Sequence, residues 1–217
     1  MLQKKDRIQK VLFWLSYVFR FIILIEVVSA AWQKDLLTLF AGIGILILTF
    51  IPSLLKKNYK ITLPTEMEFL FVLFISLSLT FGEIRNFYET YWWWDIFLHS
   101  FSAILLGFVG LLIPYILYTE KRIKTTPKFI ALFMFTFALA IGASWEIFEF
   151  GMDQIFGFNM QKSGLIDTMW DLITDGLSAL ILSIITYFYI KRKSKIPLIE
   201  SLIEKFIKIN SHLSKKR

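Results

Sequence analysis

The sequence predicts an all-α polytopic membrane protein, a bundle of six transmembrane helices followed by a C-terminal amphipathic helix. Of the 217 residues, 56% are hydrophobic and 19% are charged, and the mean hydropathy is +0.62. A soluble domain of this length could not hide so much apolar surface inside one core. The chain contains no cysteine, which excludes disulfides, thiolate metal sites and a cysteine nucleophile.

Six apolar runs are long enough to cross about 30 Å of hydrocarbon as helices of about 20 residues. In order, they cover residues 11–31, 36–55, 68–81, 95–118, 129–150 and 167–190. A basic stretch precedes the first run, as in a signal peptide, but its length and Arg20 favour an uncleaved anchor. The third run follows the letters "PTEME", in which Thr65 as N-cap and Glu68 three residues later predict a capping box.

The basic residues predict how the chain is oriented in the membrane. Clusters of Lys and Arg precede the first run and follow the second, fourth and sixth, whereas the alternate loops hold only Lys34, Arg85 and Lys162. By the positive-inside rule, both termini of this multi-pass cell-membrane protein are cytoplasmic. The net charge of +7 is then a topology signal, so we expect the lipid bilayer and no nucleic acid as a partner.

The chain is expected to have two parts. Residues 1–193 would form the six-span transmembrane domain, and residues 194–217 a cytoplasmic amphipathic helix with a basic tail. One face of that helix would carry the apolar residues Ile199, Leu202, Ile203, Phe206 and Ile207. Such a face predicts a helix that lies on the cytoplasmic membrane surface.

Acidic residues gather near the outer ends of the last three runs. The fourth run begins with Asp95 and His99, and the fifth and sixth carry Glu146, Glu149, Asp153, Asp167, Asp171 and Asp175. Helical spacing places each of these sets along one face of its helix. Too few residues separate Asp175 from the basic "KRK" for a span to begin after it, so Asp171 and Asp175 must lie within the membrane.

Ionised acids in a membrane need a counterion, because each costs about 2.5–3.5 kcal/mol at the bilayer centre. The basic residues of the outer loops are too few to supply it. Carboxylates with one imidazole suit Mg²⁺, Mn²⁺, Ca²⁺, Zn²⁺ or iron. We therefore expect a divalent metal site formed by Glu146, Glu149, Asp167, Asp171, Asp175 and His99. A proton or ion relay and a purely structural polar network are the alternatives.

Three segments on successive runs resemble a known family. The segments "YWWWDIFLH", "WEIFEFGMD" and "GLIDTMWDLITDGLSALI" are similar to the YjdF-like bacterial inner-membrane proteins, whose biochemical activity is unassigned. The resemblance covers about residues 65–190 and implies a six-helix membrane fold without implying a reaction. The residues of this chain that match the motifs of the family are Trp94, Asp95, His99, Trp145, Glu146, Glu149, Asp167, Asp171 and Asp175. A looser similarity to VanZ-like membrane proteins, which pair a D-x-x-x-H-like span with later acidic spans, points to the cell envelope.

Two active functions are consistent with these residues. In an enzyme, the metal would activate water or polarise a phosphoryl or acyl group of a lipid or envelope substrate. His99, oriented by Asp95, would be acid or base beside Glu146. In a transporter, the same acids would pass protons or a divalent cation. The inner part of the sixth run, "LSALILSIITYFYI", offers no continuing polar path and the two halves show no evident repeat, which favours the enzyme slightly.

Overall fold

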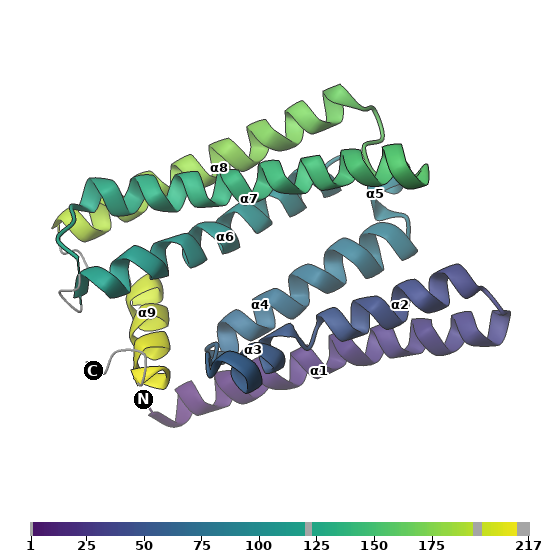
Figure 1. Ribbon diagram of the computed structural model, residues 1–217. Helices are drawn as coiled ribbons and strands as arrows, with labels where there is room; N and C mark the ends of the chain where they lie inside the picture. The colour runs from purple at the N-terminus through teal and green to yellow at the C-terminus, as the bar shows by residue number, and fades with distance from the viewer. Residues whose placement is uncertain (1, 120–122, 193–196, 212–217) are drawn as a thin grey trace. The chain divides into compact units, whose positions relative to one another are not determined.

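The computed structural model describes residues 2–119, 123–192 and 197–211 (Figure 1), and all the regular secondary structure in these residues is helical. The predicted all-α class is therefore confirmed. The helices form two compact units. Unit 1 comprises Met1–Trp92 and Leu198–Arg217, and unit 2 comprises Trp93–Pro197. The expected division into a six-span domain and a tail stays a prediction.

Unit 2 contains three long helices, α6 (Trp94–Thr119), α7 (Pro127–Phe156) and α8 (Leu165–Arg192). Each of them packs against the other two, and their directions alternate along the chain (Figure 1). We call the end that holds Trp94, Phe156 and Leu165 the acidic end, and the opposite end the basic end.

Local sequence signals set the limits of α7 and its distance from α6. The Thr126 hydroxyl caps the helix by accepting a hydrogen bond from the Phe129 N–H at 3.2 Å, and Pro127 occupies the first helical position, where its missing N–H costs nothing. The helix ends at Gly157, whose φ of +70° is the left-handed conformation typical of a C-terminal cap. A Cβ on Gly110 of α6 would lie 3.0 Å from the Phe137 side chain, so the two helices approach closely there.

Unit 1 is built around α1 (Leu2–Gln33), which packs against α2 (Leu36–Leu48) and α4 (Thr65–Ile75). The other elements of unit 1 are α3 (Ile51–Tyr59), the π-helix η1 (Ser76–Ile84), α5 (Phe87–Thr90) and α9 (Pro197–Ile209).

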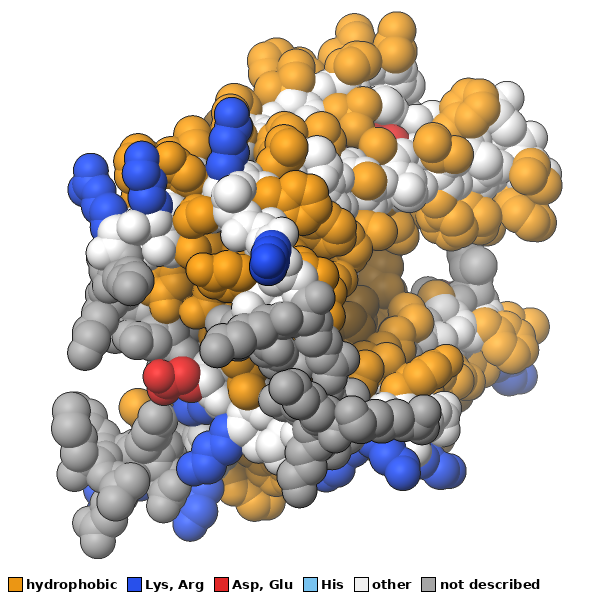
Figure 2. Space-filling model, turned by 60° about the vertical axis from the view of Figure 1, so that its left-hand side comes forward, with side chains coloured by type: hydrophobic (Ala, Val, Ile, Leu, Met, Phe, Trp, Pro, Cys, Tyr) orange, Lys and Arg blue, Asp and Glu red, His pale blue; other side chains and the backbone are white. Residues whose placement is uncertain are grey.

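The described helices are long and apolar enough for several membrane spans. Five candidates cover residues 7–33, 65–84, 94–118, 127–156 and 165–192, and a bent pair within residues 38–59 makes a sixth if it counts as one span. Exposed hydrophobic side chains occur along all of these segments, and Figure 2 shows them over much of the visible surface. Such surfaces on long apolar helices fit contact with lipid, and the multi-pass membrane fold is confirmed.

The second span differs from the continuous helix expected over residues 36–55. The structure has α2 and α3 instead, bent by 45° at the break between them. Pro52 lies in the first turn of α3, and its ring removes the N–H that would continue the hydrogen bonding of α2. The sequence analysis overlooked this proline.

Arg20 of α1 is buried and occupies the break between α2 and α3. Its Nη2 donates to the Thr49 carbonyl at 2.9 Å, and its Nε donates to the Thr49 hydroxyl at 3.3 Å. The guanidinium also lies 4.7 Å from the centre of the Phe50 ring. A cation from α1 therefore satisfies a carbonyl at the end of α2, where the helix dipole is negative.

The capping box predicted for the third span is wrong. The residue before α4 is Pro64, and the helix has no side-chain cap. Glu68 instead accepts a hydrogen bond from Arg20 at 3.3 Å. A charge-assisted bond to a buried guanidinium is stronger than a bond to a neutral N–H, which explains why the carboxylate points away from the helix start. The span also continues beyond residue 81, as the π-helix η1.

Helix α9 is present as expected, but protein covers part of its apolar face. Leu202, Ile203 and Phe206 are buried. The Asn210 side chain accepts the Thr62 N–H at 2.7 Å and donates to the Thr62 carbonyl at 2.8 Å. Lys205 is paired with Glu66. Helix α9 is thus attached to unit 1, and these three apolar side chains do not face lipid as expected.

Candidate functional site

The acidic end of unit 2 collects polar side chains from all three of its helices. Helix α6 contributes Asp95 and His99, α7 contributes Glu146, Glu149 and Asp153, and α8 contributes Asp167, Asp171 and Asp175. The deepest of these side chains are His99, Glu146, Asp171 and Asp175, all of which are buried. Because the helices carry their acids at three- and four-residue intervals, each helix presents them toward the interior of the unit.

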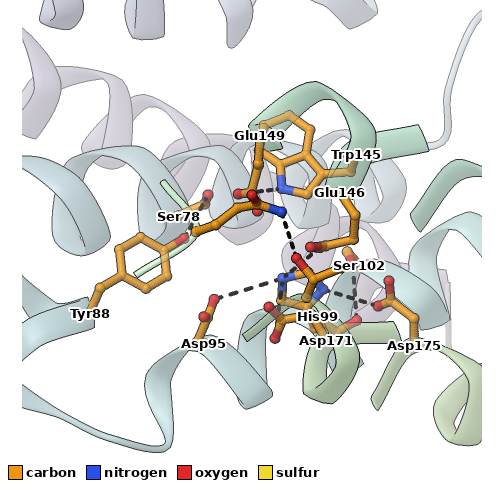
Figure 3. A network of polar contacts seen from close by, with 12 residues as sticks. Ser78, Tyr88, Asp95, His99, Ser102, Trp145, Glu146, Glu149, Asp171 and Asp175 are labelled. Carbon is orange, nitrogen blue, oxygen red and sulfur yellow. Dashed lines mark hydrogen bonds and ion pairs between the residues drawn. The ribbon is translucent and has the colours of Figure 1, made fainter. Parts of the chain in front are cut away.

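His99 lies at the centre of this cluster (Figure 3). Its Nδ1 is 3.3 Å from Asp175 Oδ1, a hydrogen bond in which the ring nitrogen is the donor when Nδ1 carries the proton. Its Nε2 lies 3.7 Å from Asp171 Oδ1, 3.8 Å from Asp95 Oδ1 and 3.9 Å from Glu146 Oε1. One imidazole thus faces four carboxylates, which come from three helices.

The structure changes the expected partner of the imidazole. The sequence analysis assigned the orienting role to Asp95, four residues before His99 on the same helix. Asp175 makes the hydrogen bond instead, on Nδ1, and Asp95 lies on the Nε2 side together with Asp171. Spacing within α6 predicted that Asp95 and His99 share a face, but only the packing of α8 against α6 shows which carboxylate reaches which ring nitrogen.

Gly142 of α7 makes room for the Asp175 carboxyl group. A Cβ on Gly142 would lie 2.2 Å from Asp175 Oδ2 and 3.0 Å from its Cγ, which are impossible contacts. The sequence analysis interpreted Gly142 as one of several small residues for helix packing. Its position indicates a more specific role. Because Gly142 has no side chain, the Asp175 carboxyl group can occupy the space next to His99.

Two buried carboxylates have oxygens that form no direct hydrogen bond within the described part of the chain. These are both oxygens of Glu146 and the Oδ2 atom of Asp175, in residues that are 4% and 1% exposed. The Thr168 hydroxyl is a nearby donor for Glu146. A buried carboxylate is costly unless a cation, a proton or a donor compensates it. The cluster therefore fits a bound cation or proton.

The cluster has the dimensions of a metal site. One ligand atom each from Asp95, His99 and Asp171 lies within 4.8 Å of the others. Metal–ligand bonds of about 2.0–2.3 Å place opposite ligands about 4 to 4.6 Å apart, so small side-chain movements would bring these three atoms onto one ion. Glu146 Oε1 lies on the same side of the imidazole.

The other predicted site residues have separate environments. Glu149 accepts a hydrogen bond from the Trp145 indole N–H at 2.9 Å. Asp153 accepts the N–H groups of Met160 and Gln161 at 2.7 and 2.9 Å, which fixes the loop between α7 and α8. Glu149 and Asp167 are only half-buried, so we place them at the rim of the cluster.

The buried face of α8 remains partly polar beyond Asp175. Ser183, Thr186 and Tyr189 are buried on α8 at intervals of three residues. They share the buried face of Asp171 and Asp175, but Ser183 follows Asp175 by eight residues, with the buried Ala179 between them. The sequence analysis found no polar continuation because it considered the apolar composition of this segment. The helical spacing of its hydroxyl residues was the signal that could have indicated one.

Comparison with known proteins links this architecture to one family. The chain matches the family described as "Predicted membrane protein (DUF2238)" over residues 14–192. A protein of Thermotoga maritima, described as "Uncharacterized protein", is 30% identical over 139 residues, which cover 64% of this chain and 70% of the relative. No solved structure matches the chain. The YjdF-like resemblance is thereby confirmed, since DUF2238 is that family.

Proposed function

The chain belongs to the DUF2238 family of predicted membrane proteins, and we propose that the acidic end of unit 2 binds a catalytic divalent metal ion. The metal would serve a reaction on a lipid or envelope substrate. The observation that carries the proposal is the buried Glu146, whose two carboxylate oxygens form no direct hydrogen bond within the described part of the chain; the Thr168 hydroxyl is a nearby donor. Glu146 lies beside three potential ligand atoms, from Asp95, His99 and Asp171.

The geometry supports distinct roles for the five clustered residues. Asp95, Asp171 and the Nε2 atom of His99 are the proposed ligands, a set of three that leaves a coordination position open, as in catalytic metal sites. Asp175 holds Nδ1 of the imidazole, and a carboxylate in this place fixes the ring and makes the other nitrogen a better ligand. Glu146 remains as the group that accepts or delivers a proton.

This assignment modifies the roles expected from the sequence. Asp175 changes from ligand to positioning residue, and Asp95 changes from positioning residue to ligand. With Nε2 on the metal and Nδ1 on Asp175, His99 has no nitrogen left for acid–base chemistry. Glu146 is therefore the proposed proton acceptor or donor, and Glu149 and Asp167 lie at the rim without a proposed role as ligands.

The chemistry follows from the buried setting of these groups. A bound divalent ion would polarise an acyl or phosphoryl oxygen, or activate a water molecule. The chain's own contribution is to hold the imidazole through Asp175, to keep Glu146 next to the reacting atoms and to restrict bulk water. These groups act more strongly in such a site than they would in solvent.

The surface around the cluster supports an amphiphilic substrate. Ile147, Trp170 and Ile173 lie on the same helical turns as the buried acids, and they are 71%, 61% and 45% exposed. Exposed apolar side chains at this level support a position of the cluster within the membrane rather than in an aqueous domain. The apolar tail of an amphiphilic substrate would contact these exposed apolar side chains, and its polar head would reach the cluster.

A second candidate function is the transport of protons or divalent cations. It is supported by the buried polar residues Ser183, Thr186 and Tyr189, which begin eight residues after Asp175 and continue toward the basic end of α8. Thr186 is 0% exposed, and its hydroxyl has no hydrogen-bond partner in the described part of the chain. Water or a moving ion could supply that partner.

Metal binding can be tested on the purified protein. Elemental analysis and Mn²⁺ titration followed by electron paramagnetic resonance should find about one tightly bound ion, and chelation should lower the melting temperature because the ion binds only the folded state. Asp95→Asn and Asp171→Asn should lose this ion. Glu149→Gln, which removes a charge from the rim at the same end, is the matched control and should retain it.

The outcomes separate the candidates. Wild-type protein without bound metal and with an unchanged melting curve under chelation would overturn the metal site. Reconstitution into liposomes that contain dyes sensitive to Mn²⁺ and to pH then distinguishes the two functions. An inward flux that Glu146→Gln abolishes would favour the transporter, and metal binding without flux would favour the enzyme.

A further inference from the structure

The acidic end of unit 2 is rich in carboxyl groups and poor in basic residues. Its seven carboxylates are Asp95, Glu146, Glu149, Asp153, Asp167, Asp171 and Asp175. Among the described residues of unit 2, Lys162 is the basic residue at this end, and it interacts electrostatically with Asp167. The others, Lys124, Lys128, Lys191 and Arg192, lie at the basic end. A ligand at the cluster therefore meets mostly carboxylates.

The backbone of the loop between α7 and α8 does not offset this charge. Its N–H groups at Met160 and Gln161 donate to Asp153, and the Gln161 side-chain amide donates to Thr168. Backbone N–H groups of this kind often bind phosphate. Here the chain's own carboxylate uses them, and the first turn of α8 carries the acidic Asp167.

One divalent ion would not compensate all the carboxyl groups of the cluster. Four of them, those of Asp95, Glu146, Asp171 and Asp175, lie within 3.9 Å of a ring nitrogen of His99. A divalent cation compensates the charges of two carboxylates, and Glu149 and Asp167 add two carboxyl groups at the rim. A phosphate group would thus meet mainly carboxyl groups, and Lys162 is the basic residue that the described part of unit 2 holds at this end.

We infer that the site accepts an uncharged polar headgroup, such as an ester or amide of an amphiphile, and rejects phosphate-bearing headgroups. This inference rests on the proposed metal site and narrows its substrate class. The inference depends on two features that lie side by side. The proposed metal ligands are surrounded by further carboxyl groups, and the exposed side chains on the same helical turns are apolar. Like charges across a binding site oppose an anionic ligand, whereas a neutral carbonyl oxygen can still reach the metal.

Mn²⁺-loaded protein in phosphatidylcholine nanodiscs provides the test. The bound ion enhances water-proton relaxation, and a ligand that enters its coordination sphere lowers that effect. The probes are 1-octanoylglycerol and octanamide, compared with octyl phosphate, which has the same tail length, and with inorganic phosphate. The uncharged amphiphiles should lower the relaxation in a saturable way, and the two phosphates should leave it unchanged.

A rim variant tests the electrostatic cause. The double substitution Glu149→Gln and Asp167→Asn replaces two carboxyl groups of the rim by amides, which cannot carry a negative charge, and changes none of the proposed ligands. It should retain Mn²⁺ and bind octyl phosphate about tenfold or more tightly than the wild type does. Saturable binding of octyl phosphate to the wild type, no binding of either uncharged probe, or no gain in the variant would each overturn the inference. Absence of Mn²⁺ from the wild type would instead refute the proposed function.

Discussion

The two ring nitrogens of His99 have different neighbours, and this difference assigns roles to single carboxylates. Asp175 alone lies on Nδ1, whereas Asp95 and Asp171 lie on Nε2. We predict that Asp175→Asn weakens Mn²⁺ binding about 10- to 100-fold, the usual effect of losing a group that orients a metal ligand. Asp95→Asn should abolish binding, because a neutral amide replaces a charged ligand. Titration of both purified variants measures the contrast.

The reverse order of effects would assign the roles differently. If Asp175→Asn lost the metal completely and Asp95→Asn only weakened its binding, Asp175 would be the ligand and Asp95 the orienting group, as the sequence analysis expected. Circular dichroism of both variants verifies that they retain their helices. The two substitutions preserve side-chain volume, so packing changes should be small.

Gly142 allows a second residue-scale prediction. Ala at this position would place its Cβ 2.2 Å from Asp175 Oδ2, so the carboxyl group must move away from the imidazole. Gly142→Ala should therefore weaken metal binding at least as much as Asp175→Asn does. Gly151→Ala on the same helix is the matched control, because a Cβ there meets nothing within 4 Å and should leave binding unchanged. Equal metal affinity in both glycine variants would contradict the role of Gly142.

The residue types of the site were predictable, but their partners were not. Spacing along single helices correctly indicated that Asp95, His99, Glu146, Asp171 and Asp175 come together, because each helix presents one face to the interior. Which carboxylate reaches Nδ1 depends on how α8 is translated and rotated against α6 and α7. That geometry is set by contacts such as the one between Gly142 and Asp175, which a pattern along one helix does not contain.

Among the helices, the break between α2 and α3 depends on a residue from a third helix. Arg20 of α1 donates to Thr49 and to Glu68, and its side chain is 6% exposed. Arg20→Leu should destabilise the protein by about 1–3 kcal/mol, because the Thr49 carbonyl loses a buried donor and the partly exposed Glu68 loses its charged partner. Thermal unfolding in detergent measures this loss.

A double substitution identifies the cause of that loss. Glu68→Gln together with Arg20→Leu removes the carboxylate that would otherwise be left unpaired, so it should recover part of the stability. If the double variant were no more stable than Arg20→Leu, the loss would come from the Thr49 carbonyl and from packing rather than from the ion pair. The break between α2 and α3 would then be held mainly by hydrogen bonds.

Helix α9 supplies a further prediction about an element. Asn210→Ala removes both hydrogen bonds to Thr62 and a third to the Phe206 carbonyl at 2.8 Å. Amide hydrogen exchange in residues 202–211 should therefore become faster, while exchange in α6 to α8 stays unchanged. The exposed Lys208 provides the control Lys208→Ala. Unchanged protection of α9 in Asn210→Ala would show that its apolar contacts suffice.

Helix positions were more predictable than helix interruptions. Apolar runs predicted the spans because about 20 residues are needed to cross the hydrocarbon region, and the spans of unit 2 lie within α6, α7 and α8. The break at Thr49 and the π-helix from Ser76 to Ile84 were missed. Pro52 was a visible signal for the break, but its geometry also depends on Arg20, which is distant in sequence. We found no sequence signal for the π-helix.

At the scale of the whole molecule, family membership includes both units. The match covers residues 14–192, whereas the three motifs that carried the resemblance lie between residues 65 and 190. The part of unit 1 from residue 14 to residue 92 therefore belongs to the family's common architecture rather than being an addition to the site-bearing helices. The ion pair of the buried Arg20 with the partly exposed Glu68 fits this interpretation, since charged groups inside a membrane seldom occur without a purpose.

The orientation of the chain decides which compartment supplies the substrate. The positive-inside rule predicts a cytoplasmic basic end and an external acidic end. Because the chain contains no cysteine, single cysteines can report the topology without background. Ser163 lies in the loop at the acidic end, and Asn58 lies near the end of α3; both are exposed. Ser163→Cys should react with a membrane-impermeant maleimide in intact cells, and Asn58→Cys only after permeabilisation. The opposite pattern would place the cluster at the cytoplasmic face, and a substrate from the outer leaflet would be excluded while the metal site itself could remain.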